Sequence, residues 1–139
     1  MKIVYADACY WIALFNPKDQ LHRNAKEISS KLGACRIVTS EMIIVELLYG
    51  LSGCGPVLRE KAVKIIMKLR ENPNVEIVPQ TSRQLQCAIK RYERMKDKEW
   101  GIPDCASFDI MEEKGIKEAL TYDRHFIQAG YVAFMKETP

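Results

Sequence analysis

The sequence predicts an α/β fold in which a small parallel sheet of about five strands carries helices on both faces. Short runs rich in β-branched residues alternate along the chain with longer segments whose apolar residues recur every three or four positions. Parallel strands require such helical crossovers between them. The 139 residues, 47% of them apolar, suffice for one core. Because the chain contains no repeat, low-complexity tract or linker, we expect one domain over residues 1–139.

Local signals place the elements of the first half. Asn16-Pro17 stops a first helix, and Gly33 ends a second one, as glycine commonly does. A Gly-Cys-Gly-Pro break at residues 53–56 separates the next two helices. In chain order we expect a strand at 2–6, a helix at 8–16, a helix at 21–32, a strand at 36–39 and helices at 40–51 and 58–69.

The second half contains the clearest amphipathic helix, at residues 81–97, and we expect its apolar stripe to face the core. Residues 100–103 are expected to be a loop before a helix that Asp104 opens and Gly115 ends. Asp123 terminates a strand, after which Arg124-His125-Phe126 is expected to turn away. The apolar stripe consists of Leu85, Ala88, Ile89, Tyr92 and Met95, and the expected strands are 75–78, 119–122 and 131–135.

Composition excludes several classes of protein. No run of eighteen apolar residues occurs, and residues 1–7 lack a signal-peptide pattern, so we expect a cytoplasmic protein without membrane contact. Five cysteines without a C-x-x-C motif, beside only two histidines, argue against a zinc site or a disulfide framework. We expect these thiols to be reduced and mostly buried, with Cys54 as the exposed exception.

The net charge of +3 is unevenly distributed. Residues 57–98 carry eleven Lys or Arg against five Asp or Glu, a local excess of +6 that leaves −3 for the rest of the chain. A basic flank beside an acidic remainder suits a polyanion held near a carboxylate site, although a merely solvated basic face has the same composition.

Four carboxylates are expected to meet at one edge of the sheet. Asp7 and Asp123 each follow a strand, and Asp104 opens a helix. Glu46 lies about two turns into the helix after the second strand, in an otherwise apolar segment. Ligands of open α/β sheets bind at this edge, outside the carboxyl ends of the strands. Each acid alone could be a cap or a solvated residue, but four together repel one another, and Mg²⁺ or Mn²⁺ resolves that conflict with oxygen ligands.

In this arrangement the chain resembles a PIN domain, specifically the VapC-type toxin nucleases of bacterial and archaeal toxin-antitoxin pairs. The matching segments are KIVYADACYWIAL around Asp7, TSEMIIVELLYG around Glu46, GIPDCASFDIM around Asp104 and LTYDRHF around Asp123. The resemblance implies a five-stranded parallel sheet and a metal-dependent ribonuclease in which these four acids bind Mg²⁺ or Mn²⁺. It also implies that the hydroxyl of Thr121 supports the water shell of the metal.

The expected function is therefore an endoribonuclease that cleaves phosphodiester bonds of single-stranded or looped RNA. One cation would activate the attacking water, and a second, arriving with substrate, would neutralise the leaving oxygen. Basic residues between 57 and 98, together with Arg124, are candidates to hold phosphates. Trp100 either stacks on a base or packs against the helix that follows it.

Two acids are placed outside the metal site, and two other functions remain open. Glu41 lies five residues before Glu46, and Asp109 lies five residues after Asp104. In each pair the two side chains point about 140° apart around the helix axis. A catalytically silent PIN-like module that binds RNA or protein would share the fold; the presence of all four acids speaks against it but does not prove turnover. A phosphatase of the haloacid-dehalogenase type would need a second Asp where this chain has Cys9.

Two protein partners are implied by the resemblance alone. VapC-like toxins form homodimers, and each is silenced by a small VapB-like antitoxin whose tail covers the acidic site. Partners of both kinds are expected here.

Overall fold

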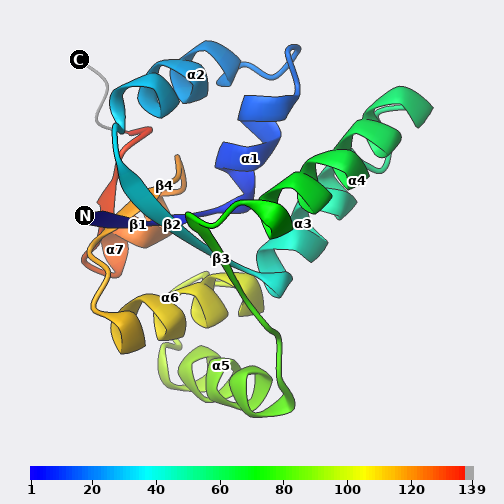
Figure 1. The fold of residues 1–139 in the computed structure, drawn as a ribbon. Coiled ribbons are helices and arrows are strands. Elements are labelled where there is room, and N and C mark those ends of the chain that lie inside the picture. The colour runs from blue at the N-terminus through cyan, green and yellow to red at the C-terminus, as the bar shows by residue number, and fades with distance from the viewer. Residues whose placement is uncertain (137–139) are drawn as a thin grey trace.

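Five parallel strands form one sheet in the order β3-β2-β1-β4-β5, which confirms the predicted fold class. The computed structural model describes residues 1–136. Figure 1 shows α2 on one side of the sheet and α5 with α6 on the other, with α3 and α4 beside it. The first strand is central because it pairs with both β2 and β4. No helix of the described residues is long and apolar enough to cross a membrane.

The strands and helices follow the predicted order closely. The strands are β1 Lys2–Ala6, β2 Cys35–Ser40, β3 Val75–Val78, β4 Glu118–Leu120 and β5 Val132–Ala133. The helices are α1 Ala8–Phe15, α2 His22–Lys31, α3 Glu41–Leu51, α4 Pro56–Glu71, α5 Ser82–Arg94, α6 Ile102–Lys114 and α7 Arg124–Gln128. Gly115 ends α6 in the left-handed conformation, at a φ of 68°, as expected of a glycine in that position.

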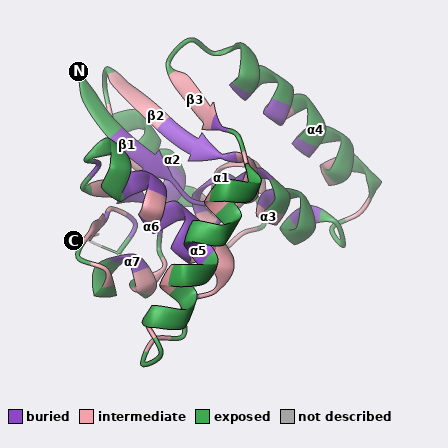
Figure 2. Cartoon of the chain, turned by 90° about the horizontal axis from the view of Figure 1, so that it is seen from below, coloured by how far each residue is buried: buried purple, intermediate pink, exposed green. Residues whose placement is uncertain are grey.

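The core lies where β1 and β2 approach their carboxyl ends (Figure 2). Val4, Tyr5 and Ala6 are completely buried because a central parallel strand is covered on both faces. The hydroxyl of Tyr5 lies 2.8 Å from the hydroxyl of Ser107 on α6, and it also donates to Ser40 at 3.3 Å. This pair of contacts joins the central strand to α6 and to the start of α3, the two helices that carry predicted site residues.

Most of the apolar stripe of α5 does not face the core, so that prediction is wrong for three of its five residues. Leu85, Ile89 and Tyr92 have exposed fractions of 40%, 47% and 56%, whereas Ala88 is fully buried and Met95 packs against the core. The buried side of the helix therefore carries Ala88 and Met95 beside Arg91, which forms ion pairs with Asp109 and Glu112 of α6. An amphipathic pattern predicts that a face is apolar, but it does not say which protein surface covers that face.

Four local predictions also differ from the structure. Residues 102–103 belong to the first turn of α6, since proline is favoured at the start of a helix. The segment after Asp123 is the helix α7 rather than a simple turn, and β5 is shorter than its predicted span. The thiols are not mostly buried, because only that of Cys105 is buried and Cys87 is exposed as well as Cys54.

Candidate metal and catalytic site

Asp7 lies at the end of β1, where its carboxylate caps α1. Its Oδ1 accepts from the backbone N–H of Ala8 at 2.9 Å, and its Oδ2 accepts from the hydroxyl of Thr121 at 2.8 Å. Only 7% of the residue is exposed. Burial and, to a lesser extent, the charges of Asp104 and Asp123 together raise the pKa of Asp7 to about 6, against the lowering effect of its hydrogen bonds with Thr121 and Ala8.

Thr121 joins Asp7 to the segment that follows β4. The residue is completely buried, and its hydroxyl oxygen accepts from the backbone N–H of Asp123 at 3.0 Å while its proton goes to Asp7. The thiol of Cys9 lies 3.3 Å from the same hydroxyl. Burial raises the pKa of Cys9 to about 12, so this thiol stays protonated at neutral pH. Thr121 therefore fixes the distance between β1 and the Asp123 turn.

Asp104 and Asp123 approach each other across a histidine. Asp104 is the third residue of α6, and Asp123 caps α7 by accepting from the backbone N–H of His125 at 2.9 Å. Nδ1 of His125 lies 2.8 Å from Oδ2 of Asp104 and 3.3 Å from Oδ1 of Asp123. Burial, followed by the charge of Asp123, raises the pKa of Asp104, and the His125 contact opposes that shift. One donor atom from each of these three residues lies within 4.8 Å of the others.

Glu46 completes the set from α3, on a helix that begins at the carboxyl end of β2. Within the described part of the chain its carboxylate makes no hydrogen bond and no ion pair. Burial, followed by the charges of Asp7, Asp104 and Asp123, raises the pKa of Glu46 to about 7. The structure thus places this carboxylate against the other acids, and it is not merely a solvated residue of a helix face.

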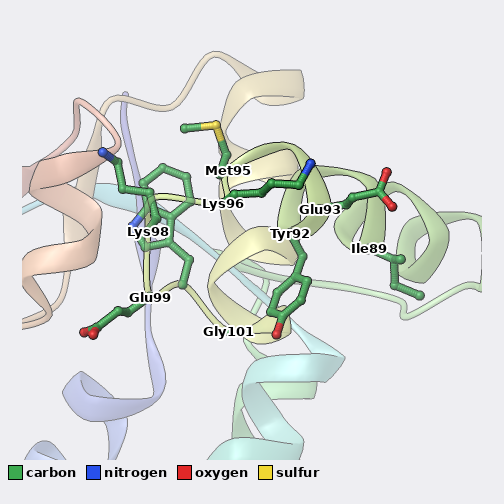
Figure 3. Close-up of a pocket in the computed structure, with 9 residues that line it drawn as sticks. Ile89, Tyr92, Glu93, Met95, Lys96, Lys98, Glu99 and Gly101 are labelled. Carbon is green, nitrogen blue, oxygen red and sulfur yellow. The ribbon is translucent and has the colours of Figure 1, made fainter.

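All four predicted acids line one cleft of about 360 Å³, together with Cys9, Ile12, Leu21 and Tyr122. A larger hollow of about 590 Å³ lies at the end of α5, lined by Ile89, Tyr92 and the segment that follows the helix (Figure 3). That hollow contains none of the four acids. We assign the chemistry to the smaller cleft because convergent groups with shifted pKa values mark a site better than volume does.

The donor set of the cleft fits a hard divalent cation. Among residues 1–136, no Lys or Arg nitrogen lies within 4.0 Å of a carboxylate oxygen of Asp7, Glu46, Asp104 or Asp123. Four carboxylates gathered without a Lys or Arg partner need another source of positive charge. Carboxylate oxygens at one open cleft are the ligands that Mg²⁺ and Mn²⁺ prefer.

The two acids that the sequence analysis set aside lie elsewhere. Glu41 accepts from the backbone N–H of Gln80 at 2.8 Å, and Asp109 pairs with Arg91 at 2.6 Å. Trp100 is 5% exposed and packs edge-on against Phe108 of α6 at 4.9 Å between ring centroids. Of the two roles considered for Trp100, packing is therefore the correct one.

His125 is the site residue that the sequence analysis missed. Its neighbourhood was expected to be a turn, so no role was assigned to its side chain. A signal was nevertheless present: Asp123 is a favoured helix cap, and the residue two positions after a cap lies in the first helical turn, close to the capping carboxylate.

Comparisons with known proteins show the family and the fold of this chain. The sequence model of the family named PIN domain matches residues 4–130. The 23S rRNA-specific endonuclease VapC20 of Mycobacterium tuberculosis is 26% identical over 136 residues, which are 97% of this chain and 100% of VapC20.

Three solved structures share the fold. The crystal structure of M. tuberculosis VapC20, described as a sarcin-ricin loop cleaving toxin, matches with a TM-score of 0.82 and 28% identity, covering 93% of this chain and 96% of VapC20. VapBC2 from Rickettsia felis, bound to a DNA fragment from its promoter, matches with a TM-score of 0.62 and 16% identity over 94% and 96% of the chains. FitAcB from Neisseria gonorrhoeae matches with a TM-score of 0.58 and 18% identity over 94% of each.

Proposed function

This chain belongs to the PIN domain family, and from that membership we propose that it is a Mg²⁺- or Mn²⁺-dependent endoribonuclease, the toxin of a type II toxin-antitoxin pair. One observation carries the proposal: four carboxylates converge in one cleft without a Lys or Arg to neutralise them, among residues 1–136. We further propose that residues 1–139 act as one domain in the cytoplasm, where the RNA substrate is found.

Asp7, Glu46, Asp104 and Asp123 would hold the cation, with Thr121 as a supporting residue. When bound, a divalent cation supplies Lewis-acid chemistry, because it activates water as a nucleophile and offsets charge on the leaving oxygen. Thr121 acts on this site through Asp7, to which it donates its proton. The half-buried thiol of Cys9 and the apolar side chains beside Asp7 limit the access of bulk water to that end of the cleft.

We propose structured ribosomal RNA as the substrate class. Support comes from VapC20, which is named as a 23S rRNA-specific endonuclease and a sarcin-ricin loop cleaving toxin and which this chain matches over nearly its whole length. The exposed guanidinium of Arg124 follows Asp123 directly, and its contact with Glu99 is long, at 3.8 Å. A surface pair of this kind is weak, so Arg124 is free to meet a phosphate beside the cleft.

We propose that a small antitoxin covers the acidic cleft. The proposal follows the VapC-type resemblance, and it has a physical counterpart in the cleft. A peptide that fills a space lined by Asp7, Glu46, Asp104 and Asp123 must bring a positive charge, because a neutral segment would leave those carboxylates desolvated and unpaired. We expect the inhibitory segment to insert an Arg or a Lys.

We propose that a second copy of the chain covers the exposed stripe of α5. Leu85, Ile89 and Tyr92 lie at helical spacing on one face, and Figure 3 shows Ile89 and Tyr92 projecting from the helix. Ile89→Lys should convert the homodimer to a monomer in light scattering after size exclusion. Val57→Lys, on α4, is the matched control because Val57 is also an exposed apolar residue. A variant with unchanged mass would exclude this face.

The decisive experiment for the proposed activity compares the wild type with Asp104→Asn. Mn²⁺ binding is measured by calorimetry, while cleavage of a sarcin-ricin loop RNA and of an unrelated hairpin is followed with and without EDTA. We expect the wild type to bind Mn²⁺ and to cleave, and Asp104→Asn to do neither. The protein must first be freed of any copurified partner.

The alternative, a catalytically silent module that binds RNA or protein, gives a different result. Such a module would bind RNA without cleaving it, and EDTA would have no effect. All four acids of the family pattern lie in one cleft, and this arrangement favours the nuclease.

A further inference from the structure

His125 contacts two of the four site acids through two different groups. Its backbone N–H donates to Oδ1 of Asp123 at 2.9 Å, and its ring Nδ1 lies 2.8 Å from Oδ2 of Asp104. The two acids come from separate elements, since Asp104 lies in α6 and Asp123 follows β4. A single residue therefore connects the two elements that supply Asp104 and Asp123 to the proposed metal site.

The ring is held in place by the core. Phe126, the next residue, is completely buried and packs edge-on against Phe108 at 4.9 Å and near Tyr5 at 6.5 Å. Phe108 lies one helical turn after Asp104 in α6, so the aromatic contact fixes α7 against the same helix that carries the carboxylate. The side chain of His125 is only 19% exposed.

The contact between Nδ1 and Asp104 has the geometry of a hydrogen bond, since the two atoms lie 2.8 Å apart. An ionised carboxylate only accepts hydrogen bonds, so in this contact the ring N–H donates to an ionised Asp104. Among residues 1–136, neither Asp104 nor Asp123 has a Lys or Arg nitrogen within 4.0 Å.

We propose that His125 is a positioning residue that sets the separation of Asp104 and Asp123 before a cation arrives. The inference rests on the proposed metal-dependent function. Residues that hydrogen-bond to metal ligands orient them and contribute strongly to affinity. The rival role, in which Nδ1 itself binds the cation, would require the ring to lose the proton that it donates to Asp104.

Two variants separate these roles, since this chain has only two histidines. His125→Leu keeps a side chain of similar bulk but removes the donor. His125→Asn places an amide nitrogen near the position of Nδ1 and so restores a donor without an imidazole. His22→Asn is the matched control, because Nδ1 of His22 contacts the backbone carbonyl of Ala13 at 2.8 Å and lies outside the acid cleft.

The measurements are Mn²⁺ affinity by calorimetry, nitrogen coupling to bound Mn²⁺ by pulsed electron paramagnetic resonance, and RNA cleavage. We expect His125→Leu to weaken Mn²⁺ binding about 10- to 100-fold, the usual cost of removing such a partner. His125→Asn should recover most of the affinity, and His22→Asn should match the wild type. We expect no coupling between bound Mn²⁺ and an imidazole nitrogen in the wild type or in any of the variants.

Three results would overturn the proposal, and they differ from one another. Imidazole coupling in the wild type and in His22→Asn, lost in His125→Asn, would make His125 a metal ligand. If a folded His125→Leu bound Mn²⁺ with the wild-type affinity, His125 would have no part in positioning the two acids. A wild type that neither binds Mn²⁺ nor cleaves would overturn the proposed function itself, before any variant is compared.

Discussion

Replacing Asp7 by Asn should stabilise the metal-free protein at alkaline pH and destabilise it at acidic pH. Asp7 is the one fully buried member of the four site acids, with 7% exposed, and its pKa is about 6 instead of 3.8. The folded state therefore favours the protonated acid. The free-energy cost of burying the ionised Asp7 carboxylate is small below pH 3.8 and fully present above about pH 6.

The magnitude follows from the two pKa values. Their difference of about two units corresponds to a penalty of about 3 kcal/mol at pH 8 and of roughly 0.6 kcal/mol at pH 4. Asn removes this penalty, but its amide cannot accept from both Ala8 and Thr121, which costs about 1 kcal/mol. The net change in the free energy of unfolding is then a gain of about 2 kcal/mol at pH 8 and a small loss at pH 4.

Thermal unfolding in EDTA across this pH range checks the reasoning. We expect the Tm of Asp7→Asn to exceed that of the wild type by about 7 °C at pH 8, from about 3–4 °C per kcal/mol, and to fall slightly below it at pH 4. Asp97→Asn is the control because Asp97 is exposed and lies beside Lys98. Adding Mn²⁺ should then raise the Tm of the wild type only. A difference in Tm that stays constant with pH would refute the burial argument for Asp7.

Two further predictions concern protons and ion pairs. Mn²⁺ affinity should fall as the pH is lowered from about 8 to about 5.5, because binding displaces protons from Asp7 and Glu46, whose pKa values are about 6 and about 7. Calorimetry in buffers of different ionisation enthalpy would detect the released protons, and a pH-independent affinity would contradict the assignment. Arg91→Met should cost about 2 kcal/mol in urea unfolding, because Arg91 is 16% exposed and its loss leaves the half-buried Asp109 without its cation. Arg124→Met, which breaks an exposed pair, should cost close to nothing, and equal losses in the two variants would show that burial is not the cause.

The sequence predicted the strands, most helices and the four acids because each has a local signal. Asp7 and Asp123 stand where strands end, and such positions meet at one edge of a parallel sheet. The environment of α5 could not be predicted in this way. The helical spacing of apolar residues identifies an apolar face, but the buried side of the helix takes in only Ala88 and Met95 of that face, together with Arg91.

His125 illustrates the other limit of sequence reasoning. A histidine next to Arg124 has no periodic pattern, and its role arises only because Phe126 docks α7 onto α6. The contact between His125 and Asp104 joins residues 21 positions apart in the sequence, and no local rule predicts such a contact.

The order of the strands also sets when this site can exist during protein synthesis. The central strand β1 pairs with β4, so the carboxylate of Asp7 meets Thr121 and Asp123 only after the chain has been made up to that region. A ribosome-bound chain that has released only the segment up to α5 presents two of the four acids, Asp7 and Glu46, and lacks Thr121, the side-chain partner of Asp7. Because such non-local pairings form late, the four-acid cleft cannot assemble until the chain has been made beyond Asp123.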